Sequence, residues 1–233
     1  MFFGLDLASP LFWSAFGSIL LANIVLSGDN AVVIAMAART LQPAQRNKAI
    51  FWGSAAAIIM RIVLTIVAIQ LLTLPFLKLI GAVLLVYIGV DLLRGEEEGD
   101  GDGKEINGMM AAIRTILIAD LVMSLDNVLA VAAAAKGDVP SLVLGLLVSI
   151  PLIIFGATLL TKVMERFPII ITVGAALLGF LAGEMLLTDP AVTSYLGVMS
   201  SQTVTIAGVV GALLVVALGK WLSRGHTSSN AAA

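Results

Sequence analysis

The chain contains 233 residues, of which 60% are hydrophobic and only 12% charged, and its mean hydropathy is +1.08. A soluble domain has about twice this fraction of charged residues, so the composition excludes an ordinary soluble protein, and no nucleic-acid partner is expected. The net charge is −2, and the absence of cysteine excludes disulfides, thiolate metal sites and thiol redox chemistry.

Apolar segments of about 18–25 residues recur along the chain, and each can cross a hydrocarbon core of about 30 Å. We therefore predict an all-α, multi-pass protein in a lipid bilayer. The first apolar run has no basic segment before it, so we expect it to be retained rather than cleaved as a signal peptide. The seven expected helices are 13–38, 50–72, 76–93, 113–135, 141–161, 168–187 and 203–222.

Two motifs occur twice, in the same order. NIVLSGDN at 23–30 matches DLVMSLDN at 120–127, and GAVLLVYIGVDLL at 81–93 matches GAALLGFLAGEMLL at 174–187, at separations of 97 and 93 residues. Because each half contains three helices, the halves should enter the membrane in opposite senses. We predict an inverted 3+3 repeat plus one C-terminal helix, an arrangement that many secondary transporters use.

The predicted organisation follows from these repeats and from the composition of the segments around them. The segment after the third helix contains EEEGDGDGKE, which is typical of a solvated loop. The parts are a first three-helix repeat (1–93), an acidic cytoplasmic linker (94–112), a second inverted repeat (113–187), a loop with the seventh helix (188–222) and a disordered cytoplasmic tail (223–233).

Basic residues are distributed unequally between the two sides of the predicted bundle. One side receives Lys78 and Lys136, and the other receives ten basic residues. Because Lys and Arg favour the cytoplasmic side, we predict an outside N-terminus and a cytoplasmic C-terminus in the plasma (inner) membrane. The ten are Arg39, Arg46, Lys48, Arg94, Lys104, Arg114, Lys162, Arg166, Lys220 and Arg224.

Both copies of the first motif place carboxylates inside an apolar helix. An aspartate at a helix centre costs roughly 2.5–3.5 kcal/mol on insertion scales, so such residues normally face the bundle interior and mark ion or proton paths. Asp29 and Asp126 are duplicated, whereas Asp120 is not. For all three, the alternative is a buried carboxylate that is protonated or paired with Arg61.

Spacing groups further polar residues with these carboxylates. Intervals of four and three residues place each set on one helix face. The sets are Asn23, Ser27 and Asn30 in the first copy, and Asp120, Ser124 and Asn127 in the second. We predict a polar wedge of carboxylate, amide and hydroxyl oxygens, with hydrogen bonding between helices as the alternative. Ser-Gly-Asp-Asn also favours a broken helix, less so in the second copy, where Leu125 replaces Gly28.

Three other charged residues lie within the predicted helices. Asp91 and Glu184 occupy matched positions near helix ends. We expect them to bind the ion at the core site or to act as relay points on its two approaches. The alternative is that they contact lipid headgroups. Arg61 lies near mid-depth. We expect it to neutralise a carboxylate when no cation is bound, and the alternative is a purely structural ion pair.

The available donors favour a hard divalent cation as substrate, because carboxylate and amide oxygens suit Mg²⁺, Ca²⁺ and Mn²⁺. The single histidine, His226, is in the tail. Met36 and Met123 lie near the wedge, where a thioether would favour a transition metal, although methionine in an apolar helix more often packs. No permanently bound cofactor is expected.

The doubled S-x-D-N motif, with RNKAIFWG at 46–53 and the helix at 81–93, resembles the TerC family of integral membrane proteins over about residues 14–222. The resemblance implies manganese export from the cytoplasm, or metal homeostasis more widely. The metal ligands that it implies are Asp29, Asn30, Asp126 and Asn127, assisted by Asp91 and Glu184.

We therefore predict a secondary transporter, not an enzyme, that exports a divalent cation, with Mn²⁺ first and H⁺ as a candidate coupling ion. The sequence leaves the oligomeric state and the choice among Mn²⁺, Ca²⁺ and Mg²⁺ open. One alternative is a membrane scaffold or metal-delivery partner without transport of its own. A second is an intramembrane aspartyl protease. Against the protease, Leu26 replaces the first glycine of the G-x-G-D signature, and the companion P-A-L motif is absent.

Overall fold

The computed structural model describes residues 28–72, 74–94, 104–135 and 139–229, together with Trp13 and Gly17; the side chains of 68–72, 104–107, 126–135, 139–142 and 224–229 are not among those described. Within these ranges the chain is helical apart from short connections. The helices are α2 (Gly28–Ala38), α3 (Pro43–Leu72), α4 (Leu77–Arg94), α5 (Lys104–Ala135), α6 (Val139–Arg166), α7 (Ile169–Thr188), α8 (Pro190–Leu196) and α9 (Ser201–Ser229).

Five of the described helices contain segments long and apolar enough to cross a membrane, as an all-α membrane protein requires. These segments are Pro43–Val67, Gly108–Leu125, Val143–Arg166, Ile169–Thr188 and Ser201–Ser223. The described part of α2 is a shorter apolar helix, and the 18 residues of α4 include Lys78, Asp91 and Arg94. Seven spanning helices therefore stay a prediction.

Several helices extend beyond their predicted bounds, because hydropathy marks only the part of a helix that lies in lipid. The helix α3 begins at Pro43 rather than at residue 50, with proline at its first position. The helix α5 begins at Lys104, so residues 104–112 of the predicted linker are helical. The helix α9 continues to Ser229, so it extends into the predicted tail, residues 223–233.

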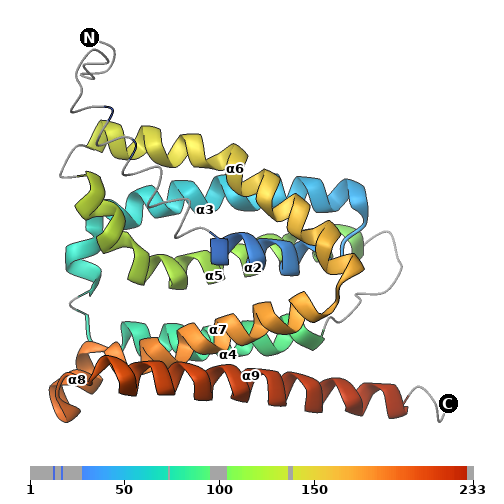
Figure 1. The fold of residues 1–233 in the computed structure, drawn as a ribbon. Coiled ribbons are helices and arrows are strands. Elements are labelled where there is room, and N and C mark those ends of the chain that lie inside the picture. Colours follow the sequence, from blue (N-terminus) through green and yellow to red (C-terminus); the bar gives the residue numbers. More distant parts are fainter. Residues whose placement is uncertain are drawn as a thin grey trace.

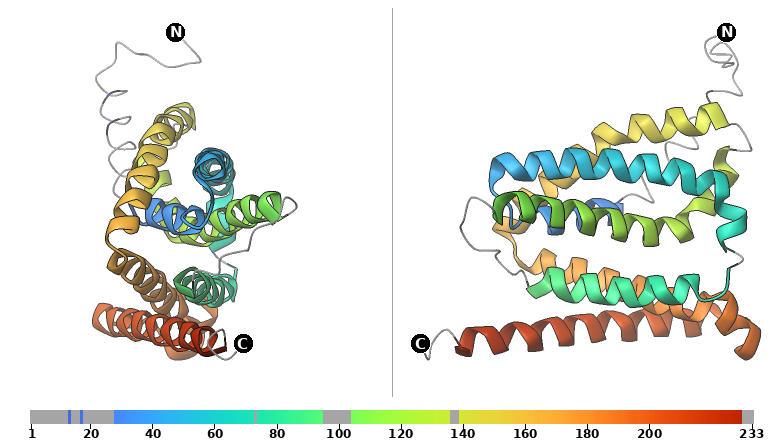
Figure 2. Two further views of the ribbon diagram at one scale, coloured as in Figure 1. Left: turned by 90° about the vertical axis from the view of Figure 1, so that its right-hand side faces the viewer. Right: turned by 180° about the vertical axis from the view of Figure 1, so that it is seen from behind.

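The helices run side by side in two sets (Figures 1 and 2). We call α2, α3, α5 and α6 the four-helix group, and α4, α7 and α9 the three-helix layer. In the four-helix group, α3 packs along α5 and α6, and α2 packs along the same two helices from the other side. In the three-helix layer, all three helices contact one another.

The contact between α7 and α9 depends on glycine. A Cβ atom added at Gly183 would lie 2.1 Å from the carbonyl oxygen of Ala207, and one added at Gly179 would lie 2.4 Å from that of Gly211. The two backbones therefore approach as closely as small residues allow, which is a common way for helices to associate in lipid. This contact attaches α9 to the rest of the three-helix layer.

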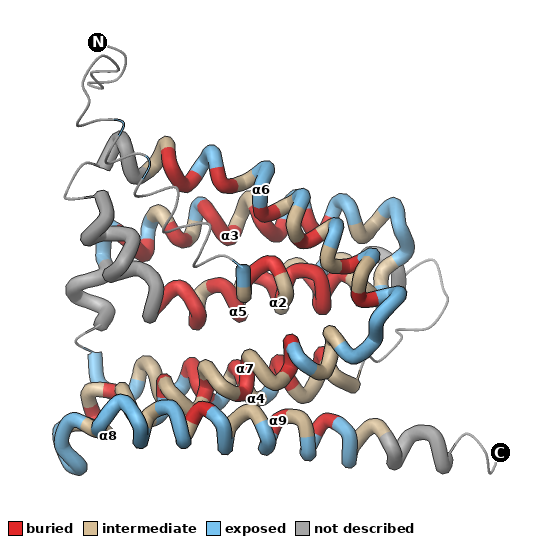
Figure 3. Tube along the Cα trace, in the orientation of Figure 1, coloured by how far each residue is buried: buried red, intermediate tan, exposed pale blue. Residues whose placement is uncertain are grey.

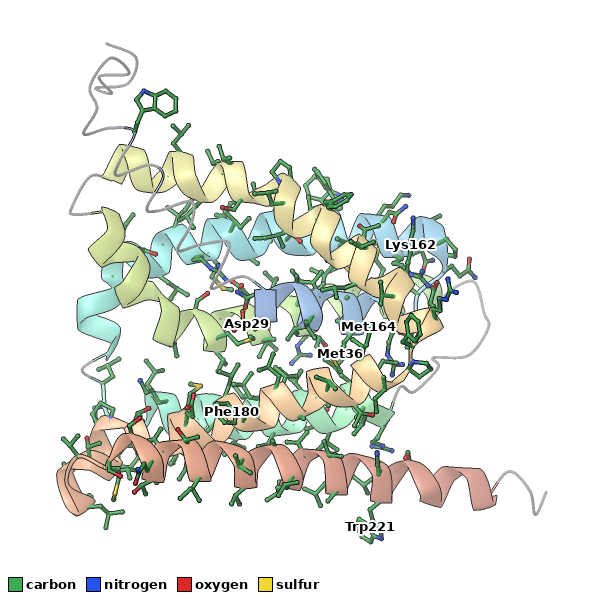
Figure 4. The ribbon with its side chains drawn as sticks, viewed as in Figure 1. Asp29, Met36, Lys162, Met164, Phe180 and Trp221 are labelled. Atoms are coloured by element: carbon green, nitrogen blue, oxygen red, sulfur yellow. The ribbon has the colours of Figure 1, made fainter. Side chains whose placement is uncertain are left out.

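Two glycines also lie where the two sets meet. A Cβ added at Gly174 of α7 would lie 2.5 Å from Sδ of Met36 in α2, and one added at Gly81 of α4 would lie 2.8 Å from a methyl group of Val122 in α5. Met36 is 1% exposed (labelled in Figure 4), so its side chain packs in the core. The packing alternative for Met36 is thus confirmed.

Buried residues face the inside of the bundle, while the outer faces are apolar and exposed (Figure 3). The outward side chains of α9 include Leu213, 66% exposed, and Trp221, 71% exposed. An apolar outer face of this kind is the one that a spanning helix presents to lipid.

Candidate ion-binding site

A buried ion pair lies at the centre of the four-helix group. The guanidinium of Arg61, in α3, donates through Nη2 to Oδ1 of Asp120, in α5. Its Nε donates to Oγ of Ser124 (3.0 Å), and that hydroxyl donates to Oδ2 of Asp120 (3.3 Å). All three residues are at most 5% exposed. Of the alternatives predicted for Asp120, pairing with Arg61 is therefore confirmed.

The local geometry explains how two charges can lie this deep. The helices α3 and α5 run in the same direction and pack along much of their length. Asp120 and Ser124 are four residues apart, so both face Arg61 from successive turns of α5. A buried ion pair offsets its desolvation cost only when further hydrogen bonds satisfy its remaining polar atoms, and Ser124 provides them to both partners.

Asp29 lies beside this pair. It is in the first turn of α2, where the helix dipole favours a negative charge, and its Oδ1 accepts a hydrogen bond from the backbone N–H of Asn30 (2.8 Å). The carboxylate interacts electrostatically with Arg61 and more weakly with Asp120. Asn30 is 3% exposed, and Figure 4 shows Asp29 about halfway along the four-helix group.

Part of the predicted site falls on residues that are not described. Asn23 and Ser27 lie outside the described residues, as do the side chains of Asp126 and Asn127. The backbone of α5 is a continuous helix through residues 126 and 127, so the second copy contains no helix break. In the first copy, residues 23–27 lie outside the described residues, so a helix break there stays a prediction.

The structure does not bring Asp91 and Glu184 together. The helices α4 and α7 pack in opposite directions, with Gly81 against Met185, the neighbour of Glu184. Asp91 is ten residues farther along α4 than Gly81, which is about 15 Å at the rise of an α-helix. Among the residues with described side chains, no three His, Cys, Asp or Glu lie close enough to hold a metal ion.

The helix ends that were predicted to share the basic side of the membrane lie together at one end of the bundle, where Figure 4 labels Lys162. Arg39 donates to the backbone oxygen of Leu92 at the end of α4 (2.8 Å), and Arg46 pairs with Glu165 of α6 (2.6 Å). The orientation in the membrane stays a prediction.

Asp189 at the opposite end was not predicted. It is the N-cap of α8, and its Oδ1 accepts from the backbone N–H groups of Ala191 (2.7 Å) and Phe76 (3.0 Å), while Oδ2 accepts from Leu79 (3.1 Å). Phe76 has a φ of 68°, in the left-handed region, so this carboxylate also holds the strained start of α4. The dipeptide Asp189-Pro190 was the available sequence signal.

The charge of Asp189 is stabilised by this arrangement. Burial raises the pKa of its carboxyl group, but the hydrogen bonds from the backbone N–H groups of Phe76, Ala191 and Leu79 together lower it by more. The resulting pKa lies below the usual value for an aspartate, and the residue connects α4 to α8 at this end of the three-helix layer.

The fold and the site define a multi-pass helical membrane protein with a cluster of charged side chains in the middle of its bundle. Residues 8–227 match the integral membrane protein TerC family, so the chain belongs to that family. The family assignment confirms the resemblance carried by the doubled S-x-D-N motif.

Relatives support this assignment. The chain is 46% identical over 167 residues to the uncharacterized membrane protein YjbE of Bacillus subtilis, covering 72% of this chain and 76% of the relative. It is 28% identical to the uncharacterized membrane protein YceF of the same organism, covering 77% and 73%. It is 24% identical to the UPF0053 inner membrane protein YgdQ of Escherichia coli, covering 70% and 75%. No solved structure matches the chain.

Proposed function

We propose that this protein is a secondary transporter of the inner membrane that exports a divalent cation, with Mn²⁺ as the first candidate, from the cytoplasm. The observation that supports it most is the charged cluster of Asp29, Arg61, Asp120 and Ser124 inside the four-helix group. Ionisable side chains inside a membrane bundle are costly and normally mark the path of an ion or a proton.

The depth of the cluster supports this proposal. Arg61 is 13 residues along α3 from Lys48, about 20 Å from the basic end at the rise of an α-helix. That distance corresponds to the middle of a hydrocarbon core of about 30 Å rather than to a headgroup region. A substrate bound here is inside the bilayer, as in transporters that alternate access around a central site.

The pattern of helix contacts supports an inverted repeat. The predicted repeat relates α2 to α5, α3 to α6 and α4 to α7. The contact between α2 and α6 then corresponds to the contact between α5 and α3, and both pairs of helices pack together. In the same way α4–α5 becomes α7–α2, and these are the two contacts at which Gly81 and Gly174 lie. The proposed pathway runs between the two halves.

In this proposal the residues have different tasks. Asp29 and Asn30 of the first copy, with Asp126 and Asn127 of the second, supply oxygen ligands to the cation. Arg61 pairs with Asp120 and so balances a negative charge at the centre when the cation has left. Since Asp91 and Glu184 lie near opposite ends of the α4–α7 pair, we assign them to the two approaches. H⁺ is the proposed coupling ion, and no chemical transformation is assigned.

The test uses purified protein in liposomes containing a dye that Mn²⁺ quenches, with a pH dye in parallel vesicles. Asp29→Asn and Asp126→Asn should each lower the flux at least about tenfold, the effect of about 1.4 kcal/mol of lost binding. Glu165→Gln, which changes a carboxylate at the exposed end, is the control and should leave the flux unchanged.

Two results decide the proposal. A proton signal that accompanies Mn²⁺ movement, and disappears with it in the variants, would support antiport. If the wild-type protein moves neither Mn²⁺, Ca²⁺ nor Mg²⁺ under a pH gradient of either direction, the transporter is refuted. A scaffold or metal-delivery role would then be the better explanation of the buried charges.

A further inference from the structure

Ser54 is a buried hydroxyl that the protein does not satisfy. It lies in α3 and is 1% exposed, yet its Oγ has no hydrogen-bond partner in the part of the chain that the structure describes. Three other buried hydroxyls of the spanning helices behave differently. Thr65, Ser149 and Thr161 each donate to the carbonyl oxygen four residues earlier, at 2.7 to 2.8 Å. This local bond is the usual solution for Ser and Thr in a membrane helix, and Ser54 does not use it.

The position of Ser54 relates it to the charged cluster. It precedes Arg61 by seven residues, which places both side chains on the same face of α3, two turns apart. The adjacent Gly53 packs on Ile116 of α5, so Ser54 lies near the same α3–α5 contact that holds the Arg61–Asp120 pair. Its distance from Arg61 along the helix is about 10 Å, towards the end of the bundle where the basic residues gather.

The neighbours of Ser54 on this face of α3 are apolar. Ile50, Ala57 and Ile58 are all buried, at most 3% exposed, and none can accept its hydroxyl proton through a side chain. An unsatisfied hydroxyl is destabilising in such surroundings, and alanine would fill nearly the same volume without that cost. The presence of the Ser54 hydroxyl at this position is explained if a polar species moves past the side chain.

We infer that Ser54 lines the approach by which a hydrated divalent cation reaches the central cluster from the basic end, with its Oγ as a transient oxygen ligand for the ion or for its bound water. This inference rests on the proposed function, and it adds to the central cluster a second position on the path of the cation. A hydroxyl oxygen is a hard ligand, so the step suits Mn²⁺, Mg²⁺ or Ca²⁺ rather than a thiophilic metal.

The absence of cysteine from the chain permits a direct test of this approach. Ser54→Cys would carry the only thiol in the full-length protein, and so would Ser149→Cys, the matched control at an equally buried serine that bonds to Gly145. A small cationic methanethiosulfonate reagent is added to either side of sealed vesicles. Ser54→Cys should react at least about tenfold faster than the control, because only a solvated thiol ionises readily.

A second measurement does not depend on the thiol. Ser54→Ala should lower the rate of Mn²⁺ flux by about five- to tenfold, the effect of one lost hydrogen bond, while Ser149→Ala leaves it unchanged. Mn²⁺ in excess should also slow the modification of Ser54→Cys.

The outcomes separate this inference from the proposed function. Modification of Ser54→Cys in vesicles that move no cation would support a solvated approach and refute transport. Cation flux combined with a Ser54→Cys thiol no more reactive than the control, and with full activity in Ser54→Ala, would leave the transporter intact and refute the role of Ser54. Modification only from the side opposite the basic end would refute the assigned direction of approach.

Discussion

Replacing Asp120 by Asn should destabilise the protein strongly, because it leaves the guanidinium of Arg61 without its counter-ion. Arg61 is 2% exposed and cannot lose its proton, so its charge stays buried in the bundle. Removing one partner of a buried ion pair costs about 3–5 kcal/mol. For a chain of this size, about 1 kcal/mol corresponds to about 2–4 °C, so the unfolding midpoint of Asp120→Asn should fall by at least about 6 °C.

The reverse change should cost less. In Arg61→Met the carboxyl group of Asp120 is left alone, but it can take up a proton and become neutral, with Ser124 still beside it. The double variant Arg61→Met with Asp120→Leu removes both charges, and exchanges of this kind are often neutral or stabilising. Its midpoint should therefore lie close to that of the wild-type protein, above both single variants.

Thermal unfolding in detergent, followed by the fluorescence of Trp52 and Trp221, measures the four proteins of this cycle. If Asp120→Asn unfolds within about 2 °C of the wild type, less than about 1 kcal/mol depends on the pair, and the cost expected from an unpaired Arg61 is refuted. A double variant no more stable than Asp120→Asn would refute it as well. Under the proposed function, the double variant should fold and yet fail to move Mn²⁺ in liposomes.

Three further predictions concern contacts outside the centre. Asp189→Ala should lower stability by about 1–2 kcal/mol, as for the loss of a helix cap. The folded pKa of Asp189 lies below its unfolded value, so its contribution is complete above the unfolded pKa and disappears as the pH falls through the folded one; melting from pH 7 to 3 should show this acid dependence in the wild type and not in the variant. Gly183→Ala should separate α7 from α9 and lower the midpoint, whereas Gly156→Ala, whose nearest contact is 3.9 Å, should not; equal midpoints would contradict the close packing. Arg46→Ala should cost no more than about 1 kcal/mol, because its partner Glu165 is 53% exposed, and a loss that persists in high salt would argue against a screened surface pair.

The helices and the polar motifs could be predicted because both depend on residues that are close together in the sequence. Length and hydropathy were enough to locate the long helices. The free-energy cost of burying a carboxylate was enough to single out Asp29 and Asp120. Which of the three predicted carboxylates pairs with Arg61 could not be predicted, because that choice depends on how α3 is placed against α5 along their common length. Hydropathy also did not reveal the polar first turns of α5, which form a helix beyond the apolar span.

Asp91 and Glu184 show a different limit. Their matched positions predicted a shared role but left two options open, ligands at the core site or relay points on its two approaches. The predicted inverted repeat would place equivalent residues towards opposite sides. The antiparallel packing of α4 on α7 separates them accordingly. Asp189 was overlooked for a third reason: the cap of a seven-residue helix is invisible to a search for membrane-length apolar segments, although Asp-Pro is a recognisable start.

The central ion pair is the part of the site that the repeat does not duplicate. Pairing the two motif copies aligns Asp120 with Asn23, and pairing Gly53 with Gly145 aligns Arg61 with Ile153, so the other half has neither charge. A site built only from duplicated residues would present the same charges to both sides of the membrane. The Arg61–Asp120 pair removes that equivalence, because it attaches α3 of one half to α5 of the other through charges that have no counterpart. Under the proposed function, this asymmetry allows the two access states to differ in energy, which an exporter with a preferred resting state requires.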